Sequence, residues 1–176
     1  MIDSLMENTL EVIIENEDLH RRWLNTLSYL EHIGSRKIIK TQSSAHTDEN
    51  TLRHAAEEAR HAYLFKKMIE KIGTGTENYA SDSLLCGFSA NRYFQSLDSL
   101  VKKKIKTGNG SSRICYLYVT ALIEERAGWL YPLYQKVLKK MNSPIDLASI
   151  IIEEERHLLE MHDGINELDS DLKINY

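Results

Sequence analysis

The chain has 176 residues, 42% of them apolar, and a formal net charge of −4. This length suits one domain with a sizeable core, so we expect a single domain over 1–176. The acidic balance disfavours nucleic-acid binding, which depends mainly on cationic contacts to phosphate. No apolar run approaches the roughly 18 residues of a membrane span, and Cys86 and Cys115 lie too far apart for a metal or redox motif. Because no secretory or transit signal is found either, we expect a cytoplasmic protein without a membrane span.

Apolar residues recur at helical spacing along most of the chain, which only 2 Pro and 8 Gly interrupt. In chain order we expect helices over about 3–15, 18–41, 48–72, 89–106, 112–141 and 144–163. Thr47 and Asp48 would cap the third of these, and Pro144 would lie near the first turn of the last. The pattern predicts an all-α four-helix bundle with its core over about 18–163. The helix at 89–106 would be an extra helix in the crossover between the second and third long helices.

A Glu-x-x-His step occurs on two of the predicted long helices, as Glu58 with His61 and as Glu154 with His157. Residues at this spacing lie one turn apart on one helix face, so both side chains of a pair can bind the same metal ion from a single rigid helix. Both copies read Glu-x-Arg-His after another glutamate, which suggests an internal repeat of two helix pairs. Chance placement of 17 Glu and 7 His yields about 0.7 such steps, whereas the chain holds three. We interpret the third, at 17–20 near a helix start, as accidental.

The other two long helices each need to supply one further carboxylate to such a site. On the first long helix, Glu31 interrupts the apolar stripe. On the third, Glu124 and Glu125 lie on different helical rows, and periodicity does not choose between them. Four buried carboxylates require neutralisation, which two divalent cations would provide. Oxygen-rich ligation with one imidazole per ion suits iron, or manganese, better than zinc.

Two glycines and a proline accompany the candidate carboxylates. Gly34 follows Glu31 by three residues, and Gly128 follows Glu124 by four. A glycine destabilises a helix interior by about 1 kcal/mol relative to alanine, so we expect each glycine to leave space beside a ligand. Close packing of helices at the glycines is the alternative. Pro132 would clash with the carbonyl of the residue four positions before it, which predicts a kink or bulge near Glu124.

This order of helices, with a carboxylate helix and a Glu-x-x-His helix each occurring twice, resembles the ferritin-like di-iron carboxylate proteins. The resemblance covers about 18–163 and implies that Glu58 and Glu154 bridge two iron ions. The string Ile123-Glu124-Glu125-Arg126-Ala127 is similar to the third-helix motif of bacterial di-iron tRNA hydroxylases, whose ligand is the first glutamate, and this favours Glu124. The spacing from the first carboxylate to the second is similar to that of cyanobacterial aldehyde-deformylating oxygenase. The ligands that the resemblance implies are Glu31, Glu58, His61, Glu124, Glu154 and His157.

The resemblance implies a di-iron oxygenase or oxidase that activates dioxygen and oxidises a small organic molecule. Electrons would come from a separate ferredoxin or reductase, and a homodimer would be ordinary for this class. A ferroxidase, an iron-handling protein or a peroxide scavenger is the alternative, followed by a structural bundle whose glutamates face solvent. Trp129 and Tyr131 would line the cavity or pass electrons, or else be ordinary core aromatics, which we favour. Nothing in the sequence names the substrate.

Overall fold

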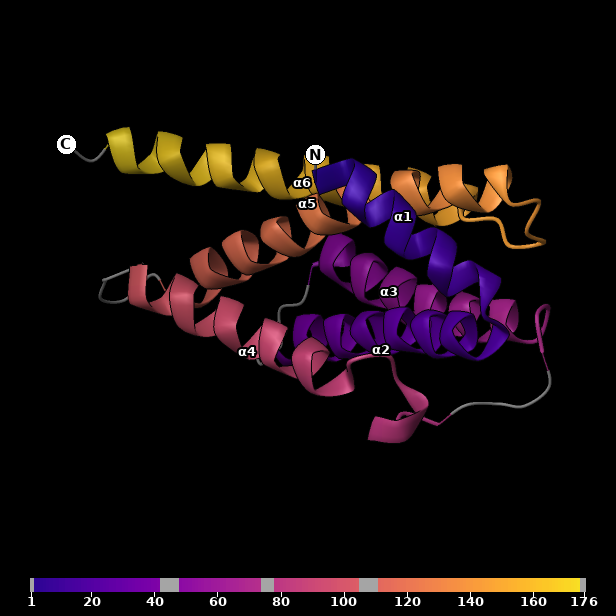
Figure 1. Ribbon diagram of the computed structural model, residues 1–176. Helices are drawn as coiled ribbons and strands as arrows, with labels where there is room; N and C mark the ends of the chain where they lie inside the picture. The colour runs from indigo at the N-terminus through magenta and orange to yellow at the C-terminus, as the bar shows by residue number, and fades with distance from the viewer. Residues whose placement is uncertain (1, 42–47, 74–77, 105–110, 175–176) are drawn as a thin grey trace.

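The structure is a computed structural model that describes residues 2–41, 48–73, 78–104 and 111–174. Within these ranges the secondary structure is entirely helical, as predicted, and the helices form a bundle (Figure 1). The elements are α1 (Ile2–Glu15), α2 (Glu17–Thr41), α3 (Glu49–Ile69), a short 3-10 helix η1 (Ser81–Ser83), α4 (Gly87–Lys104), α5 (Ser111–Lys140) and α6 (Ala148–Ile174). The predicted extra helix is α4, which lies between α3 and α5 along the chain.

The two ends of α6 differ from the prediction of a helix over 144–163. The helix begins at Ala148, so Pro144 precedes it and does not lie in its first turn. Its far end continues to Ile174. Beyond the predicted end, Gly164 does not stop the helix but lies against Leu117 of α5. Packing on a neighbouring helix therefore outweighs the weak local preference of glycine for a helix end.

Helices α2 and α3 form an antiparallel pair. The Ser28 hydroxyl donates to the carbonyl of Ala62 at 2.7 Å, and the Ser35 hydroxyl donates to the carbonyl of Ala55 at 2.7 Å. Residue numbers thus rise along α2 as they fall along α3. Each of these bonds joins a short side chain of α2 to the backbone of α3, so the two helices lie close together.

The N-terminus of α3 is capped as predicted by Asp48, whose side chain accepts a hydrogen bond from the backbone N–H of Thr51 at 2.8 Å. This bond satisfies one of the amide groups that a helix start leaves without a partner, an effect of about 1 kcal/mol. Thr47, the other predicted capping residue, lies outside the described residues. The cap holds the first turn of α3, and the candidate ligands follow along this helix.

Helices α5 and α6 form the second pair, and the core lies between the two pairs. Helix α1 packs against α2 and α5, while α4 packs mainly against α5 (Figure 1). Fully burying a leucine or phenylalanine side chain contributes about 1.5–3 kcal/mol, so this core is the main source of stability. Its fully buried members include Leu10, Leu24, Leu27, Phe65, Tyr131, Tyr134, Leu138, Leu147 and Ile150.

Pro132 lies inside α5, and the α-helix continues without a break from Ser111 to Lys140. The bulge predicted near Glu124 is therefore absent from this helix. The ribbon of α5 changes direction part-way along its length (Figure 1). A proline produces such a change because it removes one backbone hydrogen bond and crowds the preceding turn.

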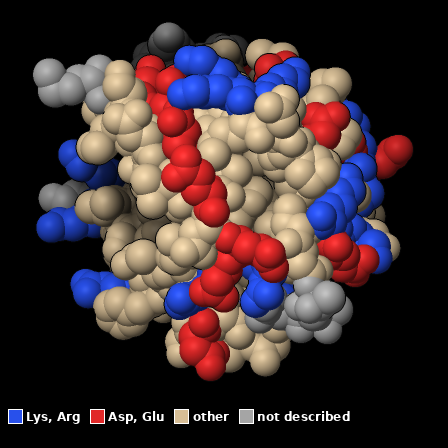
Figure 2. Space-filling view, turned by 45° about the vertical axis from the view of Figure 1, so that its right-hand side comes forward, with Lys and Arg blue, Asp and Glu red and all other residues tan. Residues whose placement is uncertain are grey.

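The surface carries both signs of charge. On the face shown in Figure 2, acidic side chains form a line across the molecule, and Lys and Arg groups flank it. None of the described helices combines the length and the apolarity that crossing a bilayer requires. The four glutamates of the candidate site do not belong to this charged surface, because they are buried inside the bundle.

Candidate metal centre

All six side chains predicted as ligands are buried in the bundle. They come from four helices: Glu31 from α2, Glu58 and His61 from α3, Glu124 from α5, and Glu154 and His157 from α6. Their exposed fractions are 5% for Glu31, 3% for Glu58, 0% for His61, 2% for Glu124, 2% for Glu154 and 0% for His157. Burial of so many ionisable groups is costly unless they are paired or bind a cation.

These side chains fall into two groups that share Glu58. Within each group, one candidate ligand atom from each residue lies within 4.8 Å of the others. The first group is Glu31, Glu58, His61 and Glu154, and the second is His54, Glu58, Glu124 and His157. Each group could hold one metal ion, and a carboxylate that belongs to both groups is placed to bridge two ions.

The structure separates the two glutamates that periodicity left open. Glu124 points into the second group, where its Oε1 lies 3.1 Å from Nε2 of His54. Glu125 is at the surface with its side chain 54% exposed, 3.6 Å from His162. The choice of Glu124 that the resemblance favoured therefore agrees with the position of this side chain in the bundle.

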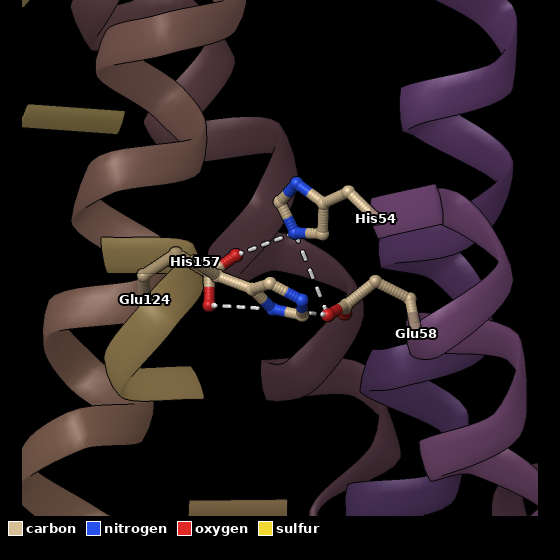
Figure 3. A group of neighbouring side chains, drawn as sticks. All are labelled: His54, Glu58, Glu124 and His157. Atoms are coloured by element: carbon tan, nitrogen blue, oxygen red, sulfur yellow. Dashed lines mark hydrogen bonds and ion pairs between the residues drawn. The ribbon is translucent and has the colours of Figure 1, made fainter. Parts of the chain in front are cut away.

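His54 was not among the predicted site residues. It lies on α3, four residues before Glu58, and is 1% exposed. Its Nε2 approaches Glu124 and also lies 3.6 Å from Oε1 of Glu58 (Figure 3). The signal was present in the sequence, because a residue four positions before a ligand lies on the same helix face. A search for Glu-x-x-His alone does not reach it.

The two histidines of the Glu-x-x-His steps are each held by a carboxylate from the opposite helix. Nε2 of His157 on α6 lies 2.8 Å from Oε2 of Glu57 on α3, and Nε2 of His61 on α3 lies 2.7 Å from Oε2 of Glu153 on α6. Each histidine thereby turns its Nδ1 toward the glutamates of the two groups. A metal-bound imidazole commonly has this arrangement, with a carboxylate orienting the ring through its other nitrogen.

The arginines of the repeated motif complete this crossed arrangement. Arg156 of α6 pairs with Glu57 at 2.6 Å, and Arg60 of α3 pairs with Glu153. In each copy of the Glu-Glu-x-Arg-His motif, the first glutamate therefore receives both the arginine and the histidine of the other copy. The sequence repeat suggested two related helix pairs, but the cross-pairing requires the helices to face each other.

Five buried atoms of the two groups have no hydrogen-bond partner among the described residues. His61 Nδ1 and Glu154 Oε1 are 2.9 Å apart and still make no hydrogen bond. A buried polar atom without a partner destabilises a fold by about 1–3 kcal/mol, so their number calls for a common cause. A cation among them would supply the missing interactions. The atoms are Glu58 Oε1, His61 Nδ1, Glu124 Oε2, Glu154 Oε1 and His157 Nδ1.

Burial and mutual repulsion raise the pKa of two of the glutamates. For Glu31, burial is the largest cause, followed by the negative charges of Glu58 and Glu154, and its pKa rises well above the ordinary value. For Glu124, burial is again the largest cause, followed by the charges of Glu154 and Glu58, and its pKa also rises well above the ordinary value. Both shifts favour the protonated acid, because ionisation would add a further negative charge to a dry site.

The pKa values of two histidines and of a third glutamate shift in the opposite sense, toward their charged forms. Burial lowers the pKa of His61, but the Glu154 carboxylate outweighs it and raises the pKa to about 9. Burial likewise opposes ionisation of Glu58, yet the neighbouring imidazoles of His157 and His54 bring its pKa well below the ordinary value. Against the effect of burial, Glu58 raises the pKa of His157 as well. Raised pKa values thus favour protons on two histidines and two glutamates of the site, and a cation would compete with those protons.

Tyr131 contacts the site, whereas Trp129 does not. The Tyr131 hydroxyl donates to Oε1 of Glu31, and the residue is fully buried. Trp129 lies at the surface and donates its indole N–H to Asp3 at 3.0 Å. Tyr131 also belongs to the hydrophobic core, so this side chain both contacts the site and packs in the core.

The glycines also differ from each other. A Cβ added to Gly34 would lie 3.1 Å from Oε2 of Glu58, so this glycine leaves room for a candidate ligand, although not for Glu31. A Cβ added to Gly128 would lie 3.9 Å from Leu158, which is an ordinary packing distance. The predicted space beside a ligand is therefore found at Gly34. Gly128 instead lies at an ordinary packing contact between helices.

The third Glu-x-x-His step, at 17–20, takes no part in the two groups. Its histidine, His20, is buried, and its Nε2 lies 2.5 Å from the hydroxyl of Tyr134. Burial lowers the pKa of His20 to about 4, which favours the neutral ring beside this hydroxyl. The interpretation of this step as accidental agrees with the structure.

Comparisons with known proteins add nothing to this geometry. No protein-family model matches the chain, and no curated protein or solved structure matches it.

Proposed function

We propose that this protein is a di-iron carboxylate oxidoreductase of ferritin-like architecture that activates dioxygen and oxidises a small organic molecule. The observation that supports this best is the pair of ligand groups sharing Glu58, with five unpartnered buried atoms among them. The donor set supports iron or manganese over zinc, since carboxylates predominate and no thiolate is present in either group.

Each part of the site has a role in this proposal. Glu58 would hold both ions, and Glu154 of the first group could reach toward the second, because its Oε2 lies 4.0 Å from Nδ1 of His157. Glu57 and Glu153 hold the two histidines in the orientation that turns Nδ1 inward. When bound, the iron ions supply the redox equivalents for dioxygen reduction.

The surrounding chain keeps the site dry and controls its protons. Tyr131 closes one side of the first group, and its hydroxyl holds a proton at Oε1 of Glu31. A water-excluding wall of this kind strengthens the electrostatic interactions inside the site. Electrons would come from a separate ferredoxin or reductase, and the protein would act in the cytoplasm as a single domain, alone or as a homodimer.

Anaerobic iron reconstitution tests the proposal. The metal-free chain is loaded with Fe²⁺ without oxygen, its iron content is measured, and oxygen is then added under optical observation. Two iron ions per chain and a new visible absorption band on oxygen addition are expected. A chain that binds no iron contradicts the proposal. Iron uptake well beyond two ions, or consumption of peroxide without an organic substrate, would instead support the iron-handling or peroxide-scavenging alternative.

A further inference from the structure

His54 distinguishes the two ligand groups from each other. The first group contains three carboxylates and one imidazole, whereas the second contains two carboxylates and two imidazoles. The additional imidazole is that of His54, which is almost fully buried and lies on the same face of α3 as Glu58. The six-residue ligand set implied by the resemblance does not include it.

The orientation of the His54 ring is that of a ligand. Nε2 faces two carboxylates of the second group, 3.1 Å from Glu124 and 3.6 Å from Glu58 (Figure 3). Nδ1 faces the opposite way and lies 3.5 Å from the hydroxyl of Tyr116. If Nδ1 carries the ring proton and donates it to Tyr116, the lone pair of Nε2 is directed into the group. In the other two histidines, too, one ring nitrogen faces the carboxylates of the site and the other contacts a polar side chain outside it.

A second histidine ring of the same group lies beside His54. The rings of His54 and His157 lie with their centroids 4.0 Å apart and tilted by 34°. Nε2 of His54 and Nδ1 of His157 lie 3.6 Å and 3.4 Å from the same atom, Oε1 of Glu58. That oxygen has no hydrogen-bond partner among the described residues. Two ring nitrogens and an unpartnered carboxylate oxygen therefore converge on one point, as the ligands of one metal ion do.

We propose that His54 is a seventh metal ligand and that it makes the two metal positions chemically different. This inference rests on the metal centre proposed above. The second position, with two nitrogens, should bind a nitrogen-preferring divalent ion such as Co²⁺ more tightly than the first. The first position, rich in carboxylate, is better suited to an ion of higher charge. When Co²⁺ is added stepwise, the second position should therefore fill before the first.

Proton NMR of the Co²⁺-loaded chain counts the bound histidines directly. Each imidazole that binds Co²⁺ through one nitrogen carries its proton on the other, and that proton gives a strongly shifted resonance. The full chain is loaded with two equivalents of Co²⁺ without oxygen, once in H₂O and once in D₂O. Three shifted resonances that disappear in D₂O are expected for the wild-type chain.

The variant His54→Gln separates ligation from hydrogen bonding, because the glutamine amide can still donate to Glu124 but is a poor metal ligand. Two shifted resonances are expected, together with a loss of affinity for one of the two Co²⁺ ions of at least about tenfold. His20→Gln is the matched control, since it removes a buried histidine that lies outside both groups. It should retain three resonances and both affinities.

The outcomes separate this inference from the proposed function. Two Co²⁺ ions with only two shifted resonances in the wild-type chain would overturn the role of His54 and leave the metal centre intact. So would a His54→Gln variant with wild-type affinities and three resonances. A wild-type chain that binds no Co²⁺ would overturn both proposals. Should His54→Gln fail to fold, the wild-type count still decides.

Discussion

Glu58 is the residue whose replacement should affect both metal positions at once, because it belongs to both ligand groups. The variant Glu58→Gln keeps the size of the side chain and removes its charge. We expect it to lose both ions. By contrast, Glu31→Gln should lose the ion of the first group and keep the second, and Glu124→Gln should do the reverse, because each of these residues belongs to one group only.

The expected size of the effect follows from binding linkage. A metal ion supplied at a hundredfold excess over its Kd stabilises the folded chain by about 2.7 kcal/mol, so two ions contribute about 5 kcal/mol. In a chain of this size, 1 kcal/mol raises Tm by about 2–4 °C. Metal should therefore raise Tm by about 10–20 °C in the wild-type chain, by about half as much in Glu31→Gln or Glu124→Gln, and hardly at all in Glu58→Gln.

Differential scanning calorimetry of each variant, with and without Co²⁺ under anaerobic conditions, measures this difference. The comparison is made within each variant, so any effect of the substitution on the metal-free chain cancels. Glu125→Gln is the control, because this side chain is exposed beside Glu124 and should leave the metal-induced rise unchanged. A full rise in Glu58→Gln, or the loss of the entire rise in Glu31→Gln, would refute the division into two groups that share Glu58.

Three further predictions follow from the same geometry. Gly34→Ala should weaken binding of both ions in metal titrations, because its Cβ would lie 3.1 Å from Oε2 of Glu58. Glu57→Gln, which weakens the acceptor for Nε2 of His157, should lower metal affinity by about 10–100-fold in the same titrations. In the metal-free chain, the pKa of His61 is raised from 6.5 to about 9, so its stabilising contribution is complete below pH 6.5 and disappears as the pH rises through 9. Tm of the metal-free chain, followed by calorimetry, should therefore fall across this range, and Tm of the metal-loaded chain should fall less.

Each of these predictions has a control or a contrary outcome. Gly128→Ala is the matched glycine substitution, since its added Cβ would make only an ordinary contact with Leu158, and it should leave metal binding intact. Unchanged affinity in Glu57→Gln would mean that the crossed carboxylate does not orient the ring. The raised pKa values of Glu31 and Glu124 act in the same direction as that of His61, because an acid with a raised folded pKa also loses its stabilising contribution as the pH rises. A metal-free Tm that rises with pH would therefore contradict all three shifts.

The order and class of the helices could be predicted from the sequence because both depend on local interactions. Periodicity, the Asp48 cap and the scarcity of helix breakers act within a few residues, so they predict helices whatever the tertiary packing of the chain. The one-turn spacing within each Glu-x-x-His step is also a local property. His54 was within reach of the same reasoning, since it lies one turn before Glu58 on the same helix face.

Neighbouring residues on a helix point about 100° apart, so a small rotation of a whole helix decides which of them faces inward. That rotation is fixed by contacts with other helices, and for this reason periodicity alone could not separate Glu124 from Glu125, whose different positions appear in the folded chain. The pairing of Glu57 with His157, and of Glu153 with the histidine of α3, likewise exists only because α3 and α6 face each other.

The sequence by itself determined the helical class of the described chain and the residue types of a carboxylate and histidine cluster, because helix periodicity and one-turn spacing are encoded over a few neighbouring positions. The tertiary structure alone decided which carboxylates meet, that Glu58 belongs to two groups, and that His54 joins the second. The physical reason is that buried charge requires a partner, and partners from four helices come within reach only when the packing of the core has set the rotation of every helix.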